Sequence, residues 1–169
     1  VFLIFNTTSA IVLHPTPGHP EKTLVHALLH HCGASLQGIG GVKRPGLVHR
    51  LDIYTSGVMV FANTELCHTK LCEIFSNPDL DRRYNAIVWG QPPTEGIINK
   101  RIARSTINRK KMSISEQGKL AITKWKTLDV YAPFGTLIEC KLETGRTHQI
   151  RVHLSDKGHS ISGDHIYEK

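Results

Sequence analysis

The stretch Gly46-Leu47-Val48-His49-Arg50-Leu51-Asp52-Ile53-Tyr54-Thr55-Ser56-Gly57 decides how this chain is interpreted. Apolar residues typical of a strand lead into a turn that places Asp52 between an arginine and a small polar loop. A carboxylate in basic surroundings can stay ionised, as a carboxylate nucleophile must. An aspartate in a turn more often only caps its own backbone, so at this point both interpretations of Asp52 remain open.

A hydrolytic triad is the first alternative for this stretch, because it contains His49, Asp52 and Ser56. Triad members normally come from distant segments of a chain and not from one short loop. The chain also has no Gly-x-Ser-x-Gly turn of the kind that presents a nucleophilic serine. We therefore exclude the triad.

The 169 residues are enough for one well-filled domain and few for two. With 40% hydrophobic and 21% charged residues, the composition is that of an ordinary globular protein. No apolar run approaches the roughly 20 residues that a membrane helix needs, so we expect no membrane partner. Because the sequence starts at Val1 and not at Met, we expect residues 1–169 to form one domain of a longer chain.

The charge balance favours a polyanionic partner: 21 Lys and Arg face 14 Asp and Glu, a net charge of +7. Phosphate neutralisation by Lys and Arg dominates nucleic-acid affinity, although a solvated basic surface is the alternative. The basic residues that we expect to contact RNA lie near the Asp52 motif and in two later segments. They are Lys43, Arg44, Arg50, Arg83, Arg109, Lys110 and Lys111.

A metal site is not expected from the cysteines and histidines. The four cysteines form no Cys-x-x-Cys pair, which argues against a zinc site and a disulfide scaffold and favours free thiols in a reducing compartment. His26 and His30 have helical i, i+4 spacing, but Ala27 stands where a zincin has glutamate. We therefore expect neither a metal nor a cofactor.

Hydrophobic periodicity predicts an α+β fold with a largely antiparallel, mixed sheet flanked by helices and loops. Residues 22–32 have an amphipathic helical pattern with Thr23 as a possible cap, and 83–89 alternate as a strand with Tyr84, Ala86 and Val88 on one face. The predicted strands are 1–5, 10–13, 58–62, 83–89, 120–130 and 136–142, and the predicted helices are 22–32, 64–76 and 147–156.

Several motifs resemble those of the RluA-type pseudouridine synthases, most closely the RluD-like branch that acts on large-subunit ribosomal RNA. Pro45 to Asn63 carries the aspartate motif, Arg83 to Gly90 resembles the tyrosine motif, and Leu142 to Leu154 resembles a third. Gly158 to Tyr167 resembles the closing motif, and Ser105 to Met112 fits the RNA-side hairpin of this branch. The match covers nearly the whole chain.

The resemblance implies the pseudouridine synthase catalytic fold, with a central active-site cleft, and isomerisation of uridine in structured RNA without cofactor or metal. It implies that Asp52 attacks the uridine or its sugar, that Tyr84 stacks on the flipped base, and that Arg151 pairs with Asp52. Arg50 would fill the gap left by the flipped nucleotide or brace the backbone. A base must leave its stack to be reached, and an aromatic face offsets part of the lost stacking.

The chain also departs from the family pattern. Ile53 and Tyr54 replace a typical Lys-Asp pair, and Ser160 and His165 replace prolines of the closing motif. The chain stops at Lys169, before the family's last core strands, so the resemblance implies a domain that is incomplete at both ends. No S4-like RNA-binding module lies within these residues. The alternative function is a ribosome assembly factor that keeps the fold and binds RNA without needing catalysis. We expect an intracellular monomer, mitochondrial if the source is eukaryotic and cytoplasmic if it is bacterial.

Overall fold

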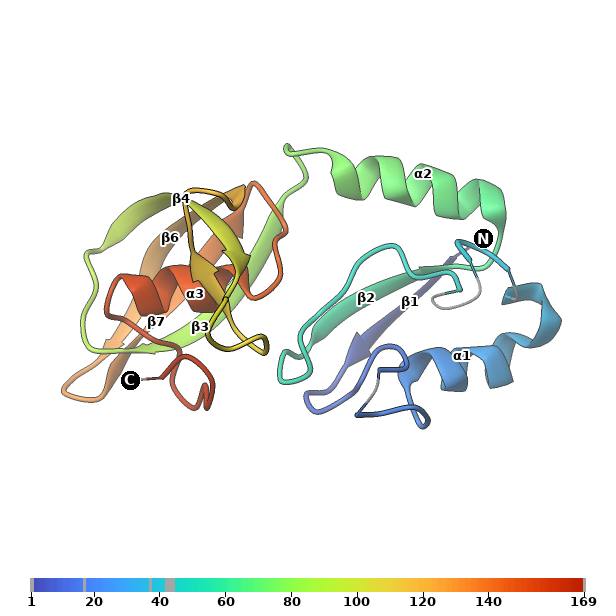
Figure 1. Cartoon of the computed structure of the whole chain (residues 1–169), viewed down its shortest axis with the longest axis horizontal. Coiled ribbons are helices and arrows are strands. Elements are labelled where there is room, and N and C mark those ends of the chain that lie inside the picture. Colours follow the sequence, from blue (N-terminus) through green and yellow to red (C-terminus); the bar gives the residue numbers. More distant parts are fainter. Residues whose placement is uncertain (1, 17, 37, 42–44, 169) are drawn as a thin grey trace. The chain divides into compact units, whose positions relative to one another are not determined.

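The computed structural model describes residues 2–16, 18–36, 38–41 and 45–168. The chain divides into two compact units, residues 1–77 and 78–169, coloured blue to green and green to red in Figure 1. We call them unit 1 and unit 2. The predicted single domain and its central cleft stay predictions.

Unit 1 is built on a pair of antiparallel strands, β1 (Phe2–Thr7) and β2 (Gly57–Ala62). The helices of the unit are α1 (Leu24–Cys32) and α2 (Glu65–Ser76), with a short 3₁₀ turn at Gly33–Leu36. Within this unit, the strand pair lies between α1 and α2 (Figure 1). The predicted helices and the predicted strands at 1–5 and 58–62 are therefore confirmed.

The predicted strand at 10–13 is wrong. Ala10 has a φ of 68°, which no strand residue adopts. The carbonyl groups of Val12 and Leu13 accept hydrogen bonds from the N–H groups of Leu24 and Val25, at 2.9 and 3.0 Å. These donors belong to the first turn of α1, which has no partners for them inside the helix. The segment therefore serves the start of α1 and not a sheet.

Unit 2 contains a five-stranded antiparallel sheet with α3 (Gln149–Asp156) packed on one face (Figure 1). The strand order is β3-β7-β6-β4-β5, and every strand pair in the described residues is antiparallel. The predicted α+β class is confirmed. The strands are β3 (Arg82–Trp89), β4 (Glu95–Arg104), β5 (Met112–Ile114), β6 (Lys119–Tyr131) and β7 (Gly135–Leu142).

Strands β4 and β5 are missing from the sequence-based prediction. In β4, Ile98 and Ile102 are buried, but Ile97 is exposed and Lys100 lies on the same alternation as the buried pair. The Nζ of Lys100 pairs with Asp156 of α3 at 2.7 Å. Because the charged Lys100 stands between two buried isoleucines in the alternation, the hydrophobic pattern that would indicate a strand is interrupted.

The core of unit 2 lies between the sheet and α3. Val88, Ile98, Trp125, Ile138 and Leu154 are buried there, with Cys140 at 0% exposure. Burial disfavours the thiolate and raises the pKa of Cys140 to about 12.

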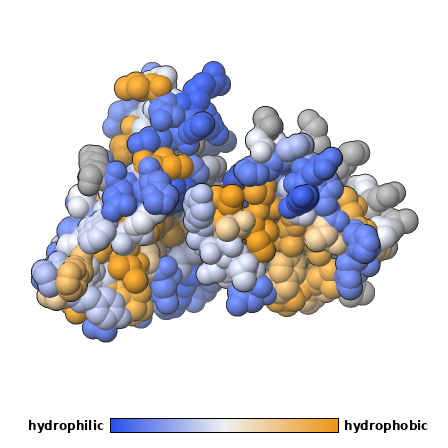
Figure 2. All heavy atoms as spheres, turned by 90° about the horizontal axis from the view of Figure 1, so that it is seen from below, coloured by the Kyte–Doolittle hydropathy of each residue, from blue (hydrophilic) through white to orange (hydrophobic). Residues whose placement is uncertain are grey.

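Apolar side chains also reach the surface, where Figure 2 shows hydrophobic patches between hydrophilic ones. The exposed apolar side chains include Phe2, Ile4 and Val58 of the β1–β2 pair. Among the described helices, none has the length and apolar character that crossing a membrane requires.

Candidate active site and nucleic-acid interface

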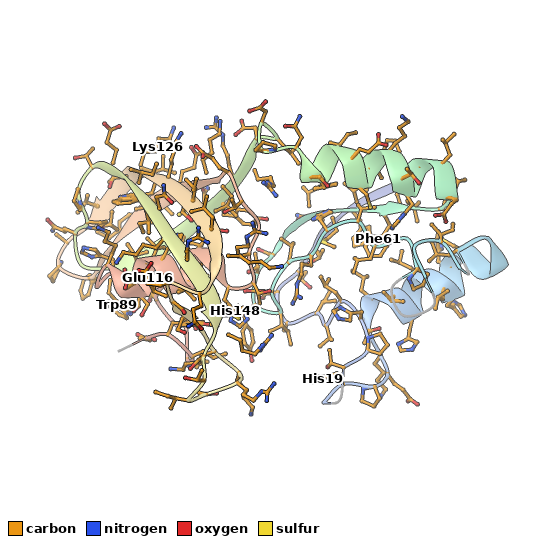
Figure 3. All side chains as sticks on the ribbon, turned by 45° about the horizontal axis from the view of Figure 1, so that its top comes forward. His19, Phe61, Trp89, Glu116, Lys126 and His148 are labelled. Atoms are coloured by element: carbon orange, nitrogen blue, oxygen red, sulfur yellow. The ribbon has the colours of Figure 1, made fainter. Side chains whose placement is uncertain are left out.

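The first half of the Asp52 motif is anchored along β2. The Ala62 N–H donates to the Gly46 carbonyl at 2.9 Å, and Leu47 forms a bridge to Phe61, which Figure 3 labels. Gly46 has a φ of 70°, and a Cβ there would lie 2.3 Å from the Ala62 carbonyl oxygen. Only glycine allows this approach, so the residue at 46 sets the path of the motif.

His49 braces the segment that leads to Asp52. Its Nε2 accepts a hydrogen bond from the Val60 N–H at 3.0 Å, and its ring stacks on Phe75 with centroids 4.3 Å apart. Burial lowers the pKa of His49 to about 4, so the ring is neutral at pH 7. An acceptor at Nε2 leaves the ring proton on Nδ1. His49 is thus a neutral structural residue, which agrees with the exclusion of a triad.

Asp52 lies in the turn that follows, and its side chain is half-buried. Its carbonyl accepts the Thr55 N–H at 2.9 Å, and the Ile53 carbonyl accepts the Ala10 N–H at 2.6 Å. Leu51, just before it, is buried in unit 1, whereas Arg50 is exposed. The backbone around the carboxylate is therefore fixed on both sides.

We expect His49→Gln to weaken the dependence of stability on pH. In the folded protein His49 has a pKa of about 4, whereas in the unfolded chain its pKa is near 6.5. Wild-type stability therefore falls as pH drops from 7 to 5, by about 1 kcal/mol after a discount for partial exposure. Glutamine cannot be protonated and can still accept the Val60 N–H. Thermal unfolding followed by circular dichroism at pH 5 and 7 measures the difference.

The matched control is His19→Gln, at an exposed histidine of the same unit. It should keep the wild-type response to pH. An equal response in His49→Gln and wild type would contradict the assigned role.

In unit 2, Tyr84 lies on the face of β3 that α3 covers. It packs against the cluster that contains Val88, Trp125 and Leu154. Arg151 lies on α3 itself. The structure thus places two of the predicted catalytic residues on one side of the sheet.

Arg83 lies on the opposite face of β3. Its guanidinium pairs with Asp81 and Glu139, each at 3.0 Å. These partners raise the pKa of Arg83, Asp81 contributing most. An RNA contact by Arg83, which the sequence predicts, would have to compete with both carboxylates.

The partner of Arg151 within unit 2 is Asp164. Arg151 Nε donates to Asp164 Oδ2 at 2.7 Å and Nη2 to Oδ1 at 2.8 Å, a bidentate pair. The two side chains are only 16% and 5% exposed. Burial acts to raise the pKa of Asp164, but the hydrogen bonds and charge of Arg151, with the N–H groups of Ile166 and Tyr167, outweigh it and lower the pKa.

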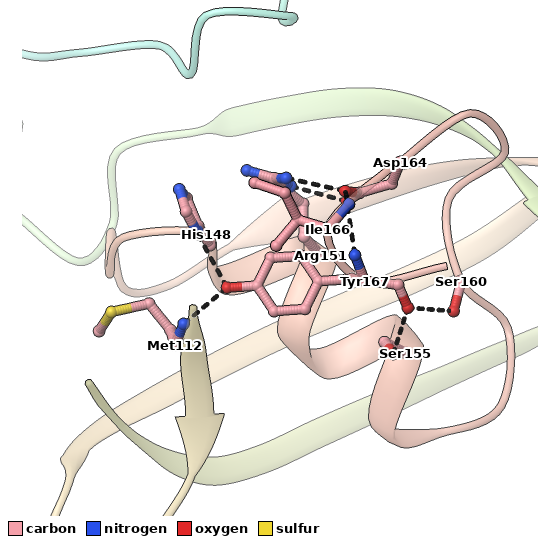
Figure 4. Close-up of polar contacts among 8 residues, drawn as sticks. All are labelled: Met112, His148, Arg151, Ser155, Ser160, Asp164, Ile166 and Tyr167. Atoms are coloured by element: carbon pink, nitrogen blue, oxygen red, sulfur yellow. Dashed lines mark hydrogen bonds and ion pairs between the residues drawn. The ribbon is translucent and has the colours of Figure 1, made fainter. Parts of the chain in front are cut away.

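Tyr167 contacts Arg151 from another side (Figure 4). The Arg151 guanidinium lies 4.9 Å from the centre of the Tyr167 ring, and Lys111 Nζ lies 5.8 Å from it. The Tyr167 hydroxyl accepts the Met112 N–H at 2.7 Å and lies 2.8 Å from His148 Nδ1. The ring therefore stands between α3 and the start of β5.

The loop before α3 is held by Gln149, which is buried. Gln149 Oε1 accepts from the Arg146 N–H and the Thr144 hydroxyl, at 2.9 and 2.8 Å. Its Nε2 donates to the Ile122 carbonyl and to Thr123 Oγ1, both at 3.0 Å. These bonds tie the loop to β6. His148 then starts α3 with a φ of 54°, a conformation that non-glycine residues rarely adopt.

A basic hairpin, which we define as residues 104–112, connects β4 to β5. Its turn is closed by the Lys111 N–H to the Asn108 carbonyl and by the Asn108 N–H to Ser105 Oγ, at 2.9 and 3.1 Å. Ile107 at the tip is 98% exposed. Three cations follow the tip: Arg109 and Lys110 are exposed, and Lys111 is half-buried. The hairpin is thus a compact, positively charged projection.

The predicted site residues are distributed over both units. Asp52 lies in unit 1, whereas Tyr84 and Arg151 lie in unit 2. The pairing of Asp52 with Arg151 therefore stays a prediction. Lys43 and Arg44 lie outside the described residues. Among the described side chains, no three His, Cys, Asp or Glu gather as a metal site requires.

Asp164 and Tyr167 are residues of this site that the sequence analysis did not single out. The closing motif contains both, as Gly163-Asp164-His165-Ile166-Tyr167. An acidic residue directly after Gly163 and three positions before a tyrosine was the available signal. Spacing does not reveal that Asp164 pairs with an arginine 13 residues earlier.

Comparison with known proteins identifies relatives over most of this chain. Residues 2–156 match the family described as RNA pseudouridylate synthase. Ribosomal large subunit pseudouridine synthase D of Zymomonas mobilis is 47% identical over 167 residues, covering 98% of this chain and 52% of that protein. The uncharacterized RNA pseudouridine synthase YlyB of Bacillus subtilis is 42% identical, covering 98% and 54%. The chain spans about half the length of these curated relatives.

Solved structures of RNA pseudouridylate synthase domain proteins are also similar to this chain. Human RNA pseudouridylate synthase domain containing 1 matches with a TM-score of 0.77 at 25% identity, over 99% of this chain and 66% of that one. Human RNA pseudouridylate synthase domain containing 4 matches with a TM-score of 0.75 at 26% identity, over 99% of this chain and 66% of that one. The likeness extends over both units.

Proposed function

The chain belongs to the RNA pseudouridylate synthase family, and on this premise we propose that it isomerises uridine to pseudouridine in RNA. The observation that carries the proposal is the match over residues 2–156, which includes Asp52, Tyr84 and Arg151. The names of several relatives specify the large ribosomal subunit, so we propose large-subunit ribosomal RNA as the substrate.

The reaction breaks the C1′–N1 bond of uridine and forms a C1′–C5 bond; C5 loses its proton and N1 gains one, so the product is an isomer of uridine. Asp52 supplies the carboxylate that attacks the base or its sugar. Tyr84 stacks on the uracil after it leaves the helix. The half-buried aspartate, in a turn fixed by hydrogen bonds, supports a role that needs a positioned nucleophile.

Arg151 holds the Asp164 carboxylate through one edge of its guanidinium. The pair with Asp164 uses Nε and Nη2. A guanidinium has a second edge, formed by Nη1 and Nη2, that can meet another carboxylate. We propose that Arg151 also pairs with Asp52 and keeps it ionised.

The RNA-binding surface includes the basic hairpin and Arg50. The net charge of +7 favours association with phosphates. We further propose a monomer that acts inside the cell without metal or cofactor. The alternative of an assembly factor that does not need catalysis is less favoured, because the relatives are named as synthases.

Pseudouridine mapping of total RNA from cells with and without the protein tests this proposal. We expect at least one uridine of large-subunit ribosomal RNA to lose its modification when the protein is absent. The purified protein should restore it on the unmodified RNA. An unchanged map would refute the proposed activity.

Replacing Arg109, Lys110 and Lys111 together with Ala should weaken RNA binding irrespective of sequence. If each cation neutralises one phosphate, the slope of log K against log salt concentration should flatten by about two to three. Titration of labelled RNA at several salt concentrations measures this slope.

The control removes the same charge elsewhere, by Lys70→Ala, Lys124→Ala and Lys126→Ala. These lysines already pair with Glu73, Glu143 and Glu139. The control should change the slope much less. An equal effect of both triple variants would mean that only net charge matters.

A further inference from the structure

Arg151 is held in two directions by residues of the closing motif. Asp164 fixes the edge of the guanidinium through two hydrogen bonds of 2.7 and 2.8 Å. The Tyr167 ring lies 4.9 Å from the guanidinium carbon, within the range of a cation–π contact. An edge contact and a ring contact together restrict both the position and the rotation of the group.

The Asp164 carboxylate is also held by backbone N–H groups of its own turn. Its Oδ1 accepts the backbone N–H groups of Ile166 and Tyr167, at 3.1 and 3.2 Å (Figure 4). The carboxylate thus closes its own turn with one oxygen and shares both oxygens with Arg151. Because its side chain is 5% exposed, water competes little for these bonds.

Tyr167 is fixed at both ends. Its carbonyl accepts the hydroxyls of Ser155 and Ser160, at 2.9 and 3.0 Å. Its own hydroxyl accepts the N–H of Met112, the last residue of the basic hairpin. The hydroxyl proton is then available to Nδ1 of His148, at the start of α3.

We propose that Asp164 and Tyr167 are positioning residues: Asp164 orients Arg151, and Tyr167 joins Arg151 and the start of α3 to the basic hairpin. The inference rests on the proposed function, because it assigns Arg151 a part in the reaction and the hairpin a part in RNA binding. It predicts different defects for the two residues. Loss of the carboxylate should disturb chemistry, whereas loss of the hydroxyl should disturb RNA binding.

The test compares Asp164→Asn and Tyr167→Phe in single-turnover reactions on the unmodified substrate RNA and in RNA titrations. Asn keeps the shape of the side chain but loses its charge and one acceptor for Arg151. We expect the single-turnover rate to fall on the order of 10- to 100-fold, the cost of a misplaced catalytic group, with RNA affinity within threefold. Phe keeps the ring beside Arg151 but loses the contacts of the hydroxyl with Met112 and His148. We expect RNA affinity to fall about 3- to 10-fold with the rate at saturating RNA within threefold.

The matched control is Asp156→Asn, at the other end of α3. Asp156 pairs with Lys100 at 2.7 Å, so the variant also breaks an ion pair between α3 and its surroundings, but one without Arg151. It should leave both rate and affinity near wild type. Equal rates for Asp164→Asn and Asp156→Asn, or unchanged RNA affinity in Tyr167→Phe, would overturn the proposal.

A second readout does not depend on activity. In ¹⁵N NMR, the Arg151 Nε–H should give a signal that exchanges slowly with solvent, because Nε donates to a buried carboxylate. The signal should persist in Tyr167→Phe and exchange fast in Asp164→Asn. If wild type made no pseudouridine, the proposed function would fail, and this signal would still decide whether Asp164 holds Arg151. Slow exchange in Asp164→Asn would overturn that part of the inference.

Discussion

Asp52→Asn is expected to abolish pseudouridine formation while leaving RNA affinity within a few fold. Asparagine fills the same space but has no negative charge and is a poor nucleophile. Loss of a nucleophile lowers the rate on the order of 10⁴-fold or more. Phosphate contacts dominate RNA binding, so affinity should change little. Quantifying pseudouridine after long incubation with excess variant measures the first effect, and a titration with labelled RNA measures the second.

The control for this variant is Asp129→Asn, at an exposed aspartate of β6. It makes the same chemical change far along the sequence from the motif and should keep full activity. Measurable turnover by purified Asp52→Asn would refute the nucleophile assignment. A large loss of RNA affinity in the same variant would show that the carboxylate serves binding instead.

Arg151→Met should destabilise unit 2 as well as eliminate activity. The change leaves the carboxylate of Asp164, which is 5% exposed, without its cation. Breaking a buried ion pair from one side costs about 3–5 kcal/mol of unfolding free energy. Both tryptophans, Trp89 and Trp125, belong to unit 2, so urea unfolding followed by tryptophan fluorescence measures this unit.

The pH dependence of the Arg151→Met defect has a definite sign. In wild type, the lowered pKa of Asp164 contributes stability above the unfolded pKa, and this stability is lost as pH falls through the folded pKa. In the variant, burial without the cation raises that pKa and penalises the ionised form. The difference between the proteins should therefore be largest near pH 7 and shrink toward pH 4. A constant difference would argue that lost packing, not charge, causes the defect.

The double variant Arg151→Met, Asp164→Asn tests whether the two side chains contribute to stability through their ion pair or independently. Removal of both charges leaves no uncompensated buried ion. We expect it to be more stable than Arg151→Met alone, although still inactive. Additive losses would contradict the coupling seen in the structure.

Local patterns predicted most elements of the fold. The alternation of Tyr84, Ala86 and Val88 correctly places these three residues on one face of β3, and the apolar spacing of 22–32 gives α1. The predicted helix at 147–156 is confirmed as Gln149–Asp156, before Gly158 at φ 84°. Each of these elements could be predicted because the periodicity of its own apolar residues shows which face is buried.

The parts that were not predicted depend on contacts between distant residues. Lys100 sits on the same alternation as the buried residues of β4 and pairs with Asp156, 56 residues later. The contact between Tyr167 and Met112 spans 55 residues. No local propensity encodes such partners, so the network around Arg151 could be recognised only in three dimensions.

The distribution of the four cysteines provides a chemical reporter for each unit. Cys32, Cys67 and Cys72 lie in unit 1 and are partly exposed, whereas Cys140, in the core of unit 2, has a pKa of about 12. Because the thiolate is the reactive form, a maleimide dye should label unit 1 of the native protein and spare unit 2. Alkylation of Cys140 then requires opening of the sheet, and its rate under increasing denaturant would follow the unfolding of unit 2 alone.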